Sequence, residues 1–113
     1  MKILESKVED TACRWAKEQG WKHRKYKTPN HRSSPDRIFM KEGRVVFIEF
    51  KRPKTDEHQA GKLSPGQEKE IKSLREAGME VHVCFSVQEA KEVLQYGAKV
   101  DLHDPTNEVT KCS

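Results

Sequence analysis

The stretch Ser34–Pro53 reads SPDRIFMKEGRVVFIEFKRP, and it decides the fold of this chain. Two runs of strand-favouring residues flank Lys41–Gly43, whose charged pair followed by glycine is typical of a hairpin turn. The second run, Arg44–Phe50, is almost continuously apolar. Such a run predicts a central strand that the rest of the domain covers on both faces.

Three charged residues stand out at the open end of this hairpin. Asp36 begins the first strand and Glu49 ends the second, so pairing across the turn brings the two carboxylates together. Glu49 and Lys51 are two residues apart on a strand and therefore point to the same face. A surface ion pair between Glu49 and Lys51 is the simpler interpretation, but the apolar neighbours favour burial, which makes a pair without a role costly.

Two neighbouring carboxylates suit Mg²⁺ or Mn²⁺, which take oxygen ligands and keep several waters. We predict that Asp36 and Glu49 bind the metal and that the main-chain carbonyl of Phe50 is a third ligand. Lys51 would then lie beside the metal and the scissile phosphate. There it could position or deprotonate a water, or stabilise charge that develops on the phosphate. The set predicts metal-dependent cleavage of a nucleic acid.

The segment before the hairpin is expected to supply one helix and one strand. Leu4–Gln19 carries apolar residues at helical spacing, and Gly20 ends the helix. Trp21–Thr28 alternates basic and larger residues, which favours a strand. Pro29–Pro35 is rich in Pro, Asn and Ser, which predicts a loop.

The segment after the hairpin is expected to alternate helix and strand. Arg52–Leu63 is polar and predicts a loop. A helix begins after Ser64, a favourable N-cap, and runs to Ala77. A buried strand over Met79–Phe85 and a helix through Tyr96 follow. The fold class is therefore α/β, a mixed four-stranded sheet flanked by helices in the order αβββαβα. The strands joined by short turns should be antiparallel, and the last should be parallel to its neighbour.

Length and composition favour one small intracellular domain. The chain of 113 residues fits a single domain at residues 1–98, followed by an irregular tail at residues 99–113. Val100 and Leu102 in that tail are candidates for a short edge strand. The three cysteines lack metal-ligand spacing, and together with the absence of a signal peptide this favours a reducing compartment. No apolar run approaches the roughly 20 residues that span a membrane.

Basic residues gather just before Asp36, and this placement favours a polyanionic partner. The chain carries 22 basic and 18 acidic residues, a formal net charge of +4. Asp36 is the only acidic residue between Trp21 and Arg37. A solvated surface segment with no partner is the alternative. The residues predicted to contact DNA are Lys22, Arg24, Lys25, Lys27, Arg32, Arg37 and Arg52.

Together these motifs resemble the PD-(D/E)xK nuclease superfamily, and more closely its virus-type replication–repair nuclease (VRR-NUC) family. The resemblance extends over Lys2–Leu94, nearly the whole chain, and the motifs are specific in combination although each alone is weak. The matching segments are Val8–Glu9, Gly20–Trp21, Ser34–Arg37, Val46–Pro53, Leu63–Gln67, Gly78–Val81 and Ser86–Ala90.

The resemblance implies a divalent-metal-dependent phosphodiesterase that cuts DNA. It assigns metal binding to Asp36 and Glu49 and makes Lys51 the catalytic lysine. An acid on the first helix completes the family's site, and helical spacing leaves two candidates, Glu9 and Glu5. Glu9 better matches the family's position, 11 residues before the glycine that ends the helix, so it is the preferred choice.

The resemblance also bears on Gln67 and on the assembly. Gln67 stands where the family has a glutamine at the start of the second helix, and it would orient Lys51 or contact DNA. A simple helix-capping role for Gln67 is the alternative. Small stand-alone members resemble Holliday-junction resolvases, so a homodimer that cuts branched DNA is expected. The competing functions are a non-catalytic nucleic-acid-binding module and a nuclease of restriction or exonuclease type.

Overall fold

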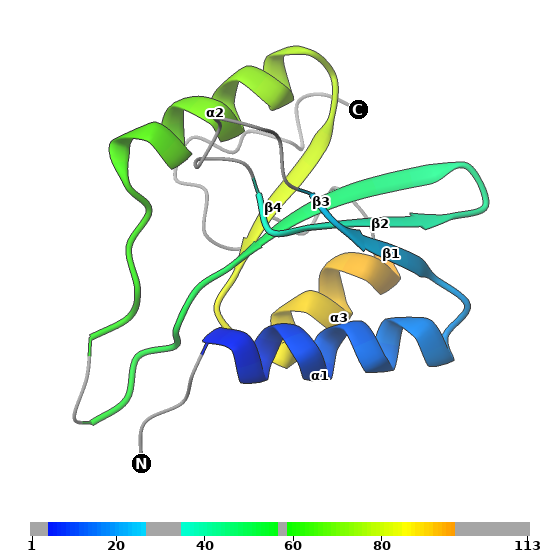
Figure 1. Cartoon of the computed structure of the whole chain (residues 1–113), viewed down its shortest axis with the longest axis horizontal. Helices are drawn as coiled ribbons and strands as arrows, with labels where there is room; N and C mark the ends of the chain where they lie inside the picture. Colours follow the sequence, from blue (N-terminus) through cyan, green and yellow to red (C-terminus); the bar gives the residue numbers. More distant parts are fainter. Residues whose placement is uncertain (1–4, 27–34, 57–58, 97–113) are drawn as a thin grey trace.

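A computed structural model describes residues 5–26, 35–56 and 59–96 of the chain. These residues form an α/β fold of three helices and a four-stranded sheet, in the predicted order (Figure 1). The elements are α1 (Glu5–Glu18), β1 (Lys22–Lys25), β2 (Arg37–Lys41), β3 (Arg44–Phe50), α2 (Pro65–Glu76), β4 (Glu80–Cys84) and α3 (Val87–Tyr96). The predicted fold class is confirmed.

The sheet has the strand order β1-β2-β3-β4, so β3 is an inner strand. β1 pairs with β2 and β2 with β3 in antiparallel fashion, whereas β3 and β4 are parallel. Two parallel strands need a long crossover connection, and α2 provides it between β3 and β4. The mixed pairing predicted from the turn lengths is therefore correct.

Helices cover both faces of the sheet, and Figure 1 shows α1 and α3 on one face and α2 on the other. Alternate residues of β3 face the two layers, as strand geometry requires. Val46, Ile48 and Phe50 join the core beneath α1 and α3. Phe47 joins a smaller core with Ile71 of α2. The predicted burial of β3 on both faces is correct, and Glu49 lies in the same face as Phe47.

The turn between β2 and β3 determines the register of the hairpin. Glu42 and Gly43 both adopt positive φ angles, 50° and 83°, which two-residue hairpin turns require and which glycine tolerates best. The turn pairs Lys41 with Arg44 and, at the other end, Arg37 with Ile48. A shift of one residue would turn every β3 side chain to the opposite face.

Two predicted strands are longer than the observed ones. The strand predicted over Trp21–Thr28 is shorter in the structure, because Trp21 still donates its backbone N–H to Ala16 of α1 and buries its indole in the core. The predicted strand over Met79–Phe85 shortens to Glu80–Cys84. The tail at residues 99–113 lies outside the described residues, together with its candidate edge strand. No helix in the described segments is long and apolar enough to cross a membrane.

Removal of the Phe39 ring should strongly destabilise the domain. Phe39 is completely buried in the centre of β2, so Phe39→Ala leaves a cavity that costs about 3–5 kcal/mol. Val45→Ala on the neighbouring strand is the control, because Val45 is 39% exposed and should cost much less. Urea denaturation followed by circular dichroism measures both, and equal midpoints would contradict this account of the core.

Candidate active site

The hairpin brings Asp36 and Glu49 together. Asp36 directly precedes Arg37, whose partner in β3 is Ile48, so the antiparallel register sets Asp36 opposite Glu49. The carboxylate of Asp36 accepts a hydrogen bond of 2.8 Å from the backbone N–H of Phe50. This bond holds the Asp36 side chain at the end of β3, next to Glu49, its predicted partner.

Glu49 is a buried carboxylate with one oxygen available. Its side chain is only 3% exposed. Oε2 accepts a hydrogen bond of 2.9 Å from Nε2 of Gln67 and lies 3.5 Å from Nζ of Lys51. Oε1 is buried and has no hydrogen-bond partner among the described residues. A buried acceptor without a partner is unfavourable unless another group, such as a cation, satisfies it.

The surroundings of Glu49 and Asp36 favour their neutral forms. Burial, followed by the negative charge of Asp36, raises the pKa of Glu49 to about 8. Burial also raises the pKa of Asp36, while the hydrogen bond from the Phe50 N–H opposes this shift. One carboxylate here is buried and the other is half-buried, and a bound cation would relieve the repulsion between them.

Lys51 lies on the same face as Glu49, as the spacing of two residues predicts. Its side chain is 11% exposed, and its backbone N–H donates to the carbonyl of Cys84 in β4 at 3.0 Å. That bond continues the β3–β4 pairing by one residue and fixes the lysine backbone. The ammonium group is therefore placed from a rigid strand end, which suits a group that must act at a defined position.

Gln67 both caps α2 and contacts Glu49. Ser64 and Gln67 form a reciprocal capping box: Gln67 N–H donates to the Ser64 hydroxyl at 3.1 Å, and Ser64 N–H donates to Gln67 Oε1 at 2.9 Å. The amide nitrogen of the same side chain then donates to Glu49. The capping role considered for Gln67 is therefore present, and its amide nitrogen also holds Glu49. Orientation of Lys51 and contact with DNA stay predictions.

The two acids of α1 have different surroundings. Glu9 forms an ion pair with Arg37, with Nε and Oε2 2.5 Å apart. Glu5 accepts a hydrogen bond of 3.3 Å from the backbone N–H of Arg52. Both negative charges raise the pKa of Asp36, and the charge of Glu5 also raises the pKa of Glu49. Glu5 therefore lies beside the Lys51–Arg52 backbone, whereas Glu9 is paired with a guanidinium. The choice of Glu9 as the acid that completes the site stays a prediction.

Gly61 belongs to the surroundings of the site, although no sequence motif singled it out. Its N–H donates to the Arg52 carbonyl at 2.8 Å, so the loop after β3 folds back onto the strand end. A Cβ at Gly61 would lie 3.2 Å from the Arg52 nitrogen, 3.3 Å from the Glu5 carboxylate and 3.5 Å from Cβ of Lys51. A glycine in a polar loop was the only signal in the sequence, and it does not indicate which segment approaches.

The described residues contain no group of three or more His, Cys, Asp or Glu side chains arranged to hold a metal ion. Mg²⁺ often binds through only one or two carboxylates, with waters and substrate phosphates completing its shell. Asp36 and Glu49 meet that smaller requirement, and the free Oε1 of Glu49 is an available ligand. The pair therefore fits a divalent cation.

The predicted DNA-contacting residues fall into two groups. Lys22, Arg24 and Lys25 are exposed on the edge strand β1. Arg37 and Arg52 make internal contacts: Arg37 pairs with Glu9, and the guanidinium of Arg52 donates to the Gln59 carbonyl at 3.0 and 2.9 Å. Two other predicted contacts, Lys27 and Arg32, lie outside the described residues.

The arrangement of a mixed sheet, flanking helices and carboxylates at the hairpin end is that of a PD-(D/E)xK-like core. A family model for the VRR-NUC domain matches residues 2–88, and the chain belongs to this nuclease-type family. A solved structure described as a VRR-NUC domain shares the fold with a TM-score of 0.67 at 22% sequence identity. That match covers 81% of this chain and 95% of the other. No curated protein matches the chain.

The raised pKa of Glu49 should make the metal-free protein less stable as pH rises. Between about 4.5 and about 8, the folded state keeps a proton on Glu49 that the unfolded state has lost. Unfolding therefore releases this proton, and the free energy of unfolding falls across that window. Glu49→Gln should flatten the decline, as measured by denaturation at several pH values with a chelator present. A decline of equal slope in the variant would contradict the assignment.

The two roles of Gln67 can be separated by comparing two variants. Ser64→Ala removes the helix cap and should cost about 1 kcal/mol of stability. It should leave the affinity for Mn²⁺ unchanged, because Ser64 does not touch Glu49. Gln67→Ala should cost a similar amount of stability and also alter Mn²⁺ affinity, since the Glu49 Oε2 loses its donor. Chemical denaturation and calorimetric titration measure the two effects, and identical Mn²⁺ affinities would limit Gln67 to capping.

Proposed function

We propose that this protein is a Mg²⁺- or Mn²⁺-dependent DNA endonuclease that acts on branched DNA. Membership of a nuclease-type family gives the general class. The observation that carries the proposal is the buried Glu49, which faces Asp36 and Lys51 and has one oxygen without a partner in the described part of the chain. A surface ion pair would have no need of this burial or of a second carboxylate opposite the first.

The proposed chemistry divides between the groups that would hold the cation and one lysine. Asp36 and Glu49 would hold the cation, with the Phe50 carbonyl as a further ligand and an acid of α1, Glu9 or Glu5, completing the site. The chemistry that a bound Mg²⁺ or Mn²⁺ supplies is positive charge at the phosphate and a lowered pKa for the attacking water. Lys51, fixed at the end of β3, would orient that water or stabilise charge that develops on the phosphate.

The basic edge of the sheet would guide the substrate. β1 is antiparallel to β2 and places Lys25 beside Arg37, directly after Asp36 in the chain. The exposed cations of β1 would neutralise phosphates of a strand that lies along this edge. Such contacts do not depend on sequence, which suits an enzyme that selects DNA by its shape.

A homodimer would present two such sites to the two strands of a junction. The apolar surface at the turn end of the sheet supports this part of the proposal. Val45 and Met79 are 39% and 41% exposed, and the parallel register that pairs Val46 with Glu80 also places them side by side. A second copy that covered this patch would bury surface that a small domain otherwise leaves in water. The proposed setting is intracellular, where DNA is handled.

Cleavage assays with a single lysine variant test the proposal. Wild-type protein with Mn²⁺ should cut a four-way junction or a flap faster than plain duplex. Lys51→Ala should reduce cutting by about 100-fold or more, in the range seen for lost proton-transfer or charge-stabilising groups. Lys72→Ala is the matched control, because Lys72 is exposed on α2 and should leave the rate unchanged. Product mapping and solution mass on the same samples report the cleavage position and the oligomeric state.

The competing function is a nucleic-acid-binding module without catalysis. It would use the basic strand β1 and would have no need of the carboxylate pair. Equal cutting by wild type and Lys51→Ala, or cutting by neither, would favour it. Salt-sensitive DNA binding that is indifferent to Asp36→Asn and to Mn²⁺ would then be the expected behaviour.

A further inference from the structure

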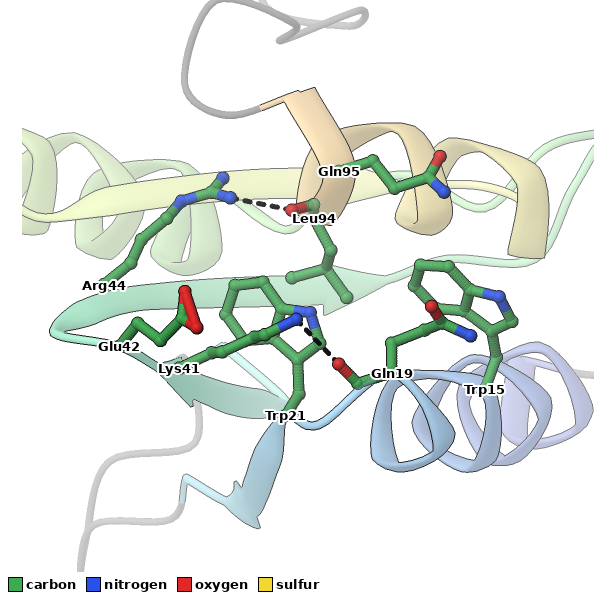
Figure 2. A pocket seen from close by; sticks show the side chains of 8 residues that line it. All are labelled: Trp15, Gln19, Trp21, Lys41, Glu42, Arg44, Leu94 and Gln95. Atoms are coloured by element: carbon green, nitrogen blue, oxygen red, sulfur yellow. Dashed lines mark hydrogen bonds between the residues drawn. The ribbon is translucent and has the colours of Figure 1, made fainter.

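A second site lies at the opposite end of the sheet from Asp36 and Glu49. A pocket of about 470 Å³ opens between the ends of α1 and α3 and the turn of the β2–β3 hairpin (Figure 2). Its volume falls within the range of about 300–1,000 Å³ that is usual for ligand sites. Trp15 and Trp21, the only two tryptophans of the chain, both line it.

The pocket combines aromatic surface with two cations and one carboxylate, that of Glu42 in the hairpin turn. Lys41 lies with its ammonium group 5.9 Å from the centre of the Trp21 ring, and the Arg44 guanidinium lies 5.5 Å from it. Lys91 lies 5.6 Å from the centre of the Trp15 ring. Indole faces and cations together are the chemistry that recognises a nucleobase with its attached phosphate.

The cations of the pocket differ in their availability. Arg44 donates to the Leu94 carbonyl at 2.7 Å and to Glu80 at 2.6 and 3.1 Å. It therefore caps the C-terminus of α3 and forms an ion pair with β4, and its guanidinium is already engaged. Lys41 donates one bond of 2.7 Å, to the Gln19 carbonyl, which places its charge at the edge of the pocket. Figure 2 shows Lys41 crossing Trp21. Lys91, the cation beside Trp15, does not line the pocket, so Trp15 is the indole offered to a ligand.

Strand β1 connects this pocket with the candidate active site. It begins directly after Trp21, and at its other end Tyr26 donates its backbone N–H to the Asp36 carbonyl at 3.0 Å. The five residue steps from Trp21 to Tyr26 span about 16 Å at about 3.3 Å per residue. That length corresponds to about five nucleotides at the stacked spacing of about 3.4 Å. The exposed cations of β1 lie along this path.

We infer that the pocket binds one unpaired nucleotide of a DNA strand, its base against Trp15 and its phosphate on Lys41, within about five nucleotides of the scissile phosphate. The inference rests on the proposed nuclease function for the course of the strand. A paired base is stacked within its duplex and cannot enter, so the pocket distinguishes strands with unpaired bases from plain duplex. This gives a single chain a way to recognise branched or open DNA.

Tryptophan fluorescence tests this directly, because every indole of the chain lies in the pocket. Wild-type protein without divalent metal is titrated with a ten-nucleotide single strand, a blunt duplex of two complementary strands and dAMP. The single strand should change the fluorescence and saturate, and the duplex should change it much less. If dAMP saturates the pocket and the single strand does not compete with it, the ligand is a free nucleotide and the assignment to a DNA strand is overturned.

Two variants locate the binding. Trp15→Leu keeps apolar volume and should weaken single-strand affinity about ten-fold, as loss of one base stack does. Lys41→Met keeps an apolar side chain over Trp21. It should reduce the slope of log affinity against log salt concentration by about 1, the value for one phosphate contact. Lys72→Met removes the same charge from the exposed face of α2 and should change neither quantity. Fluorescence anisotropy of a labelled strand measures all three, and wild-type affinity in both pocket variants overturns the inference.

The binding tests of the pocket and the cleavage assay of the nuclease proposal can fail independently. Cutting with Mn²⁺ that persists while the single strand leaves the fluorescence unchanged overturns the pocket alone. A saturating fluorescence change in a protein that never cuts DNA overturns the nuclease proposal and leaves the pocket in place. Should Trp15→Leu fail to fold, Lys41→Met decides, because Lys41 lies at the pocket edge and its loss leaves no cavity in the core.

Discussion

The register of the β2–β3 hairpin is the constraint on which the site depends. Because the turn sets Lys41 opposite Arg44, Asp36 comes to lie across from Glu49, where the Phe50 N–H can hold it. A shift of one residue would turn Glu49 toward α1 and α3 and would place an apolar residue where the carboxylate now lies. The fold and the chemistry are therefore determined by the same set of strand hydrogen bonds.

Burial raises the pKa of Glu49, and the elements packed around this residue hold the buried site together. β4 continues beside the end of β3 and fixes Lys51, while α2 begins with a capping box whose glutamine reaches the carboxylate. A cation at the free oxygen would relieve both the desolvation and the repulsion from Asp36. The start of α2 and the end of β3 are thus joined at the carboxylate by the Gln67 side chain.

The parts of the site that depend on strand pairing could be predicted from the sequence. Asp36, Glu49 and Lys51 follow from a hairpin turn and an alternation of two residues, both of which are local. The pairing of Glu9 with Arg37, the position of Glu5 and the approach of Gly61 could not be predicted. These depend on how α1 and a loop pack against the sheet, which residue spacing does not specify. The pocket around Trp15 and Trp21 could not be predicted either, because it is formed by three segments that are distant in the sequence.

The charges of β1 have a consequence for the solubility of the protein. β1 is an edge strand, and an unpaired edge is a template on which a strand from another molecule can form. Exposed Lys22, Arg24 and Lys25 make that edge repulsive to its own copies. Replacing all three with neutral, strand-favouring residues to abolish DNA binding would also remove this protection. The resulting protein would then aggregate edge to edge, and its loss of activity would be misread as a loss of DNA contacts.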